Sequence, residues 1–111
     1  MSVTESKPQH LVALEKGNQV RYARAEFKRQ VRELERGEAL FAIGELFDDP
    51  PEWAMTWPVE KPMLAVKNTK RKMMDKALRA ANLQASKRIE NCTRRQLDIL
   101  ADFYREVGEP A

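Results

Sequence analysis

The residues with the clearest chemical potential are basic side chains that cluster between Lys67 and Arg95. This stretch holds ten Lys and Arg residues against two acidic ones, Asp75 and Glu90, so its net charge is +8. The whole chain of 111 residues carries only +3, and the remainder therefore sums to −5. Such segregation favours a polyanionic partner, because cations that neutralise phosphates release condensed counterions. The alternative interpretation is a solvated helix face. The basic residues are Lys67, Lys70, Arg71, Lys72, Lys76, Arg79, Lys87, Arg88, Arg94 and Arg95.

Residues 93–96 (TRRQ) have the form of a capping box, which predicts that a helix begins at Thr93. Arg94 and Arg95 then lie in its first turn, although a helix N-terminus prefers an anion. Free N–H groups and several cations at one helix start suit a phosphate. The alternative is that both arginines point into solvent, or that Asp98 pairs with one of them. The predicted anion site consists of Lys87, Arg88, Arg94 and Arg95, with Ser86 and Thr93 as neutral donors.

Catalytic and metal chemistry find little support in the sequence. The only histidine, His10, lies near the N-terminus, and the only cysteine is Cys92. Nearby cations could lower the pKa of Cys92, but no base is apparent, and a small buried thiol is the other interpretation. One His and one Cys do not make up a protein-ligated zinc site. We therefore predict a protein that is not an enzyme and that needs no metal or cofactor.

The elements that position these residues are predicted to be helices throughout. Apolar residues recur at spacings of three and four from about 10 to 36, which predicts a long amphipathic helix with Gly37 as its stop. A second apolar stretch covers 39–47 and ends at the prolines that follow Asp49. Further helices are predicted over 62–66, from a cap at Asn68 or Thr69 to about 82, and over 93–107. The fold class is therefore all-α.

Two sets of side chains allow more than one interpretation. Trp53 and Trp57 lie in a proline-punctuated segment, where we expect them to cover the core; stacking on a nucleobase is the alternative. Arg21, Arg24, Lys28 and Arg32 form a basic ridge on the long helix, at spacings of three, four and four. They either make auxiliary contacts with phosphate or belong to a solvated face paired with glutamates.

The ends of the chain carry no targeting signal that we recognise. Residues 1–9 are predicted to be a flexible N-terminus, 10–107 a single helical DNA-binding domain and 108–111 a tail. The N-terminal residues lack a basic patch followed by an apolar core, and no uncharged run approaches the length needed to span a bilayer. We therefore expect a cytoplasmic protein with no membrane partner.

Two parts of the chain carry the pattern of a known family. The first consists of residues 14–16 (LEK) and 21–28 (RYARAEFK), and the second of residues 83–89 (LQASKRI) followed by 95–96 (RQ). The first is similar to the LEK…RxARAELK pattern in the N-terminal helix of the actinobacterial (mycobacterial-type) integration host factor family, and the second resembles that family's I-A-P-T-R-R-L…R-Q stretch. The likeness covers about residues 11–104 and suggests a divergent, phage-borne member.

The resemblance implies a fold and a partner. The family fold is a long N-terminal helix packed on a small helical domain with a helix-two-turns-helix element, here at about 60–95. Its members are nucleoid-associated monomers that bind duplex DNA through the backbone and support compaction and phage integration, which adds an integrase–DNA complex as an expected partner. Carried over to this chain, the phosphate contacts fall on Ser86, Lys87 and Arg88, and also on Lys70, Arg71 and Lys72.

The chain departs from the family pattern at two places. The family's first turn has a glycine that is missing near Lys70, although Asn68 tolerates the left-handed conformation. Glu90 stands where family members place a third arginine, and Asn91 takes the position of a glycine. Two other functions stay open: an RNA-binding or ribosome-associated module, and a phage-encoded adaptor that contacts a protein through its methionines and tryptophans.

Overall fold

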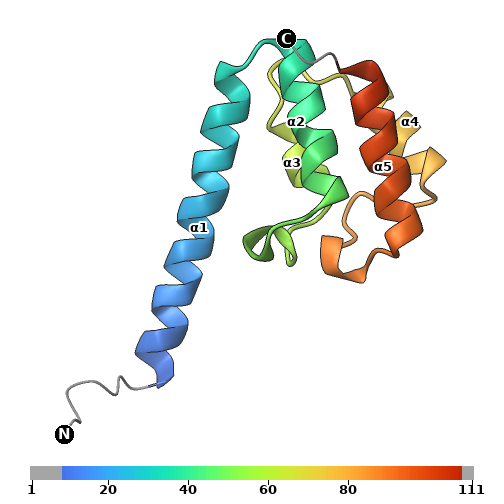
Figure 1. The fold of residues 1–111 in the computed structure, drawn as a ribbon. Helices are drawn as coiled ribbons and strands as arrows, with labels where there is room; N and C mark the ends of the chain where they lie inside the picture. Colours follow the sequence, from blue (N-terminus) through green and yellow to red (C-terminus); the bar gives the residue numbers. More distant parts are fainter. Residues whose placement is uncertain (1–8, 109–111) are drawn as a thin grey trace, which may run out of the picture.

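The computed structural model describes residues 9–108, with side chains described from Gly17 onwards, and this part of the chain is all-α. No β-strand occurs within it, which confirms the predicted fold class. Helix α1 lies to one side of the others, and its N-terminal half extends beyond them (Figure 1). The helices are α1 (Gln9–Glu33), α2 (Arg36–Asp48), α3 (Glu60–Leu64), α4 (Arg71–Ala80) and α5 (Arg94–Val107), with short 3-10 helices η2 (Glu52–Ala54) and η3 (Ile89–Asn91).

The prediction that Gly37 stops the first helix is wrong. Helix α1 ends at Glu33, and Gly37 lies in the first turn of α2. The break falls two residues earlier, at Glu35, whose extended backbone (φ −65°, ψ 156°) turns the chain. The Arg36 side chain then donates to the carbonyl of Asn68 at 3.0 Å, a contact between residues far apart in sequence. The glycine's freedom to adopt positive φ is not used, since no described glycine has a positive φ.

The core lies mainly between α2 and α5. Ile43 and Phe47 from α2 are fully buried, as are Leu100 and Tyr104 from α5. The two helices approach closely at Gly44, where a Cβ atom would lie 2.9 Å from the carbonyl oxygen of Ala101. Apolar burial along this contact is the main stabilising force of the domain.

Helix α1 joins this core through its C-terminal half. Val31 is buried, and the Phe27 ring packs 5.6 Å from the ring of Trp53 and 6.2 Å from that of Trp57, measured between centroids. Trp57 is only 4% exposed, which confirms that it belongs to the core, and Trp53 packs against the core while partly exposed. Leu34 follows the last residue of α1 and is 36% exposed.

Helix α4 begins later than the predicted cap at Asn68 or Thr69. The Thr69 hydroxyl donates to the carbonyls of Met63 and Val66 at the end of α3, so it does not cap α4. Helix α4 begins at Arg71 with Lys70 as a cap residue that makes no side-chain bond. Asn68 has a φ of 59°, which confirms that this asparagine turns the chain in the left-handed conformation.

The capping box at the start of α5 is present as predicted. The Gln96 N–H donates to the Thr93 hydroxyl at 3.1 Å, and the Thr93 N–H donates to the Gln96 side chain at 2.9 Å. Replacing Thr93 with Ala removes the first of these bonds and should lower the free energy of unfolding by about 1 kcal/mol. Urea denaturation measures this loss, and Thr93→Ser, which keeps the hydroxyl, serves as the control. An unchanged midpoint in Thr93→Ala would show that the cap contributes nothing.

Candidate functional site

The basic residues between Lys67 and Arg95 all lie on the surface. Each of the ten side chains is exposed. Nine of them form no salt bridge with a described acidic residue; Arg94 is the exception. Outside this window, by contrast, Arg29 pairs with Glu26 and Glu33, and Arg105 pairs with Glu45 and Asp48. The structure therefore leaves nine of the ten cations unpaired with described acids.

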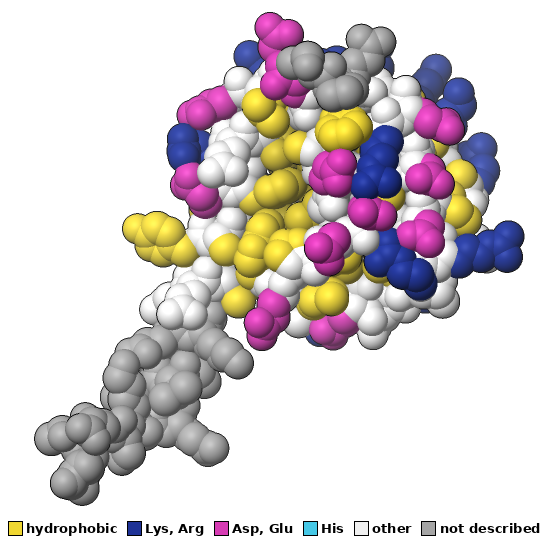
Figure 2. All heavy atoms as spheres, in the orientation of Figure 1, with side chains coloured by type: hydrophobic (Ala, Val, Ile, Leu, Met, Phe, Trp, Pro, Cys, Tyr) yellow, Lys and Arg dark blue, Asp and Glu magenta, His cyan; other side chains and the backbone are white. Residues whose placement is uncertain are grey.

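Helix α4 separates its charged and apolar faces. Met74, Ala77 and Leu78 are buried against the core, as predicted, while the basic residues of α4 are exposed. Figure 2 shows basic side chains projecting along the edge of the molecule beside α4, whereas acidic and basic side chains mix over α5. The exposed cations of this ridge are Lys70, Arg71, Lys72, Lys76 and Arg79.

The segment that carries Ser86, Lys87 and Arg88 is held by backbone hydrogen bonds. The Val59 N–H donates to the carbonyl of Lys87 at 2.9 Å. The Ile89 N–H donates to that of Trp57 at 3.0 Å. The three side chains before Ile89 are exposed, so the backbone is fixed while the side chains stay available to a ligand.

Arg94 does not point into an open anion site. Its guanidinium donates to Asp98 at 2.6 and 2.8 Å and lies 3.7 Å from a carboxylate oxygen of Asp48. The hydrogen bond to Asp98 raises the pKa of Arg94. The alternative stated from the sequence, pairing with Asp98, is therefore what the structure shows. The carboxylates neutralise a cation that the helix N-terminus would otherwise repel.

Arg95, the second arginine in the first turn of α5, is exposed and forms no salt bridge with a described acid. Cations form no hydrogen bonds or ion pairs with one another. The convergence of Lys87, Arg88 and Arg95 around Thr93 therefore stays a prediction, whereas Arg94 is already paired with Asp98.

The ridge on α1 divides into two kinds of side chain. Arg24 donates to the carbonyl of Trp53 in η2 at 2.9 Å and to the hydroxyl of Thr56, just after η2, at 2.6 Å. Lys28 lies 5.8 Å from the centroid of the Trp57 ring. Arg21 is exposed and has no described ion pair. The alternative interpretation, in which this ridge pairs with glutamates, finds no support among the described salt bridges of Arg21, Arg24, Lys28 and Arg32.

The partly buried Cys92 fits the interpretation as a small buried thiol rather than that as an activated nucleophile. Burial raises the pKa of this thiol, and it outweighs the opposing charge of Lys87. The thiol donates to the carbonyl of Arg88 at 3.4 Å. Within the described residues, no group of three or more His, Cys, Asp or Glu side chains is arranged to hold a metal ion.

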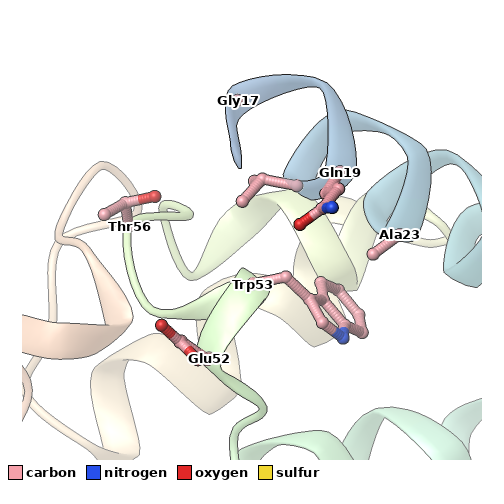
Figure 3. Close-up of a pocket in the computed structure, with 7 residues that line it drawn as sticks. Gly17, Gln19, Ala23, Glu52, Trp53 and Thr56 are labelled. Carbon is pink, nitrogen blue, oxygen red and sulfur yellow. The ribbon is translucent and has the colours of Figure 1, made fainter. Parts of the chain in front are cut away.

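A hollow of about 460 Å³ opens between α1 and η2. Trp53 lies beneath α1 beside Ala23, with Glu52 and Thr56 on the far side (Figure 3). Its lining contains one acidic side chain, Glu52, and no cation, so it does not fit an anion. The lining residues are Gly17, Gln19, Val20, Ala23, Glu52, Trp53 and Thr56.

Comparisons with other proteins found no relative of this chain. No protein-family model matches the chain, and neither a curated protein nor a solved structure is significantly similar to it. Among the helices of the described part, none is both long and apolar enough to cross a membrane.

Proposed function

We propose that this chain is a DNA-binding protein without enzymatic activity, which binds the phosphate backbone of duplex DNA as a monomer and bends or compacts it. The observation that carries the proposal is the set of nine exposed cations between Lys67 and Arg95 that no described acid neutralises. The repulsion among these cations is relieved when they bind phosphates, and the counterions condensed on the DNA are released.

Recognition of the backbone rather than of the bases follows from the residues available. The window from 67 to 95 contains no aromatic residue that could stack on an unpaired base. Outside the window, Trp57 and Phe47 are buried and Trp53 packs against the core, whereas Tyr22 on α1 is exposed. Lysines and arginines on α4 and at 87–88 can contact phosphates on any sequence.

We also propose that the chain is a divergent, integration-host-factor-like and nucleoid-associated protein. The left-handed Asn68 supports this proposal, since it provides the turn for which the family pattern uses a glycine. The order of helices α3 and α4, joined by a turn and followed by α5, agrees with the helix-two-turns-helix region expected at about 60–95.

The test is a salt-dependent binding titration with fluorescent duplexes of unrelated sequence. Affinities should agree within a few-fold among sequences and should fall steeply with salt, because counterion release dominates. A flat salt response, or tight binding to one sequence alone, contradicts the proposal. Competition with structured RNA provides the second measurement: stronger binding of the RNA would favour a ribosome-associated module. Absence of nucleic-acid binding at low salt, together with capture of one defined protein, would favour an adaptor.

A further inference from the structure

Cations from two distant parts of the chain meet around Trp57. The guanidinium carbon of Arg24 lies 5.4 Å from the centroid of the Trp57 ring, and the Lys28 ammonium lies 5.8 Å from it. The backbone of Arg88 lies next to this segment, since Arg88 pairs with Pro58 in an isolated antiparallel bridge and the Ile89 N–H donates to the Trp57 carbonyl at 3.0 Å. Helix α1 and the segment at 85–90 therefore both place basic residues close to Trp57.

The guanidinium of Arg24 is held in place but is not saturated. Two of its five N–H donors are bonded, one to the Trp53 carbonyl and one to the Thr56 hydroxyl. The other three have no partner among the described residues. A fixed planar fork with free donors is the geometry in which arginine binds phosphate oxygens.

The charges of this cluster are not balanced by described acids. Neither Arg24, Lys28 nor Arg88 forms a salt bridge with a carboxylate in the described part of the chain. Partial burial, and then the charge of Arg88, lower the pKa of Arg24. Arginine nevertheless stays protonated, so the repulsion persists in the free protein and an anion would relieve it.

We propose that Arg24, Lys28 and Arg88 form one phosphate-binding site around Trp57. Through this site, α1 and the 85–90 segment contact the same DNA strand. This inference rests on the proposed function and adds to it. In this arrangement the basic ridge of α1 does not bind a second duplex on its own. Only its residues next to Trp57 contact the DNA. A single duplex then runs from the α4 ridge across residues 87–88 to the middle of α1.

The experiment compares Lys28→Gln, Arg88→Gln and the double variant in binding to one duplex at several salt concentrations. Each single variant should weaken binding roughly threefold to tenfold and lower the salt slope by about one unit, as expected for a lost phosphate contact. The double variant should lose less than the product of the single losses, because both residues serve one phosphate. Thermal melts confirm that each variant is folded.

Arg32→Gln is the matched control, because Arg32 is an exposed cation on α1 one turn beyond Lys28 and has no described contact with Trp57. It should keep its affinity within twofold. If Arg32→Gln weakens binding as much as Lys28→Gln, the whole basic ridge of α1 contacts the DNA rather than the cluster around Trp57, and the inference fails. If Lys28→Gln keeps full affinity while Lys72→Gln on α4 loses it, the inference fails and the proposed function stands.

A second titration covers the case in which the protein does not bind DNA. Inorganic tripolyphosphate is added while tryptophan fluorescence is recorded, since Trp57 lies in the cluster and Trp53 lies 6.0 Å from it between ring centroids. A saturable change that is lost in Lys28→Gln and Arg88→Gln supports the site independently of DNA. If the wild type binds neither duplex nor tripolyphosphate, both the proposed function and this site are rejected.

Discussion

Replacing Lys87 and Arg88 together with Ala should weaken binding to every duplex by roughly 30-fold, if each phosphate contact contributes about 1 kcal/mol. The salt slope should fall by about two units, and the relative affinities for different sequences should not change. Both side chains are exposed, and the segment is held by backbone bonds from Val59 to Lys87 and from Ile89 to Trp57. The substitutions leave these bonds intact, so the variant should remain folded. Fluorescence anisotropy at several salt concentrations, with thermal melts alongside, measures the effect.

Arg94→Ala is the matched control for this double variant. Arg94 is an exposed cation in the same basic window, but it is already paired with Asp98 and Asp48. Its removal should therefore change the affinity for DNA less than threefold. If Arg94→Ala lost as much affinity as the Lys87/Arg88 variant, Arg94 would belong to the DNA-binding surface. Wild-type affinity in a folded Lys87/Arg88 variant would show that this segment does not contact DNA.

Glu90→Arg probes the same segment in the opposite direction. Glu90 is exposed at the end of the 85–90 segment, where its carboxylate opposes an approaching phosphate. The substitution removes this repulsion and adds a cation, so affinity should increase and the salt slope should steepen. Glu90→Gln, which removes the charge alone, should have a smaller effect in the same direction.

Local sequence patterns predicted the parts of the fold that depend on local interactions. The capping box at Thr93 and Gln96 joins residues three apart, and both of its bonds are present. The apolar stripe of α4, including Met74 and Leu78, is buried as its spacing predicted. The pairing of Arg94 with Asp98 was also visible as a spacing of four, although the sequence left open whether it would form.

Features that depend on tertiary contacts could not be predicted in this way. The end of α1 is fixed near Glu35, and the Arg36 side chain contacts Asn68, 32 residues away. Gly37 was a plausible stop because glycine tolerates positive φ, but the chain turns before reaching it. Local propensity carries no information about such a distant partner.

The candidate site also combines features that local sequence patterns predict with features that depend on tertiary contacts. Exposure of the basic face of α4 followed from its helical period. The meeting of Arg24 with the segment around Arg88 did not, because it depends on how α1 packs against Trp53 and Trp57. The ridge on α1 was predicted as one set, but the structure gives Arg24 and Lys28 contacts that the exposed Arg21 lacks.

Gly44→Ala should lower the free energy of unfolding by about 2 kcal/mol, because the added methyl group overpacks the contact between α2 and α5. An ideal Cβ at this position lies 2.9 Å from the carbonyl oxygen of Ala101 and 3.1 Å from the backbone nitrogen of Arg105. These are backbone atoms of α5, so they yield only if the helix shifts. The gain in helix propensity from Gly to Ala, about 1 kcal/mol, works in the other direction and is smaller than the expected strain. Urea denaturation of the folded variant gives the net value.

Gly17→Ala is the matched control, since it is the same substitution inside another helix. Its Cβ would meet only the end of the flexible Arg21 side chain, at 3.7 Å. The propensity gain is then unopposed, and stability should range from unchanged to about 1 kcal/mol higher. Opposite signs for the two variants would show that close backbone contact, rather than glycine content, governs the effect. If Gly44→Ala were as stable as Gly17→Ala, α2 and α5 would have to lie further apart than the structure places them.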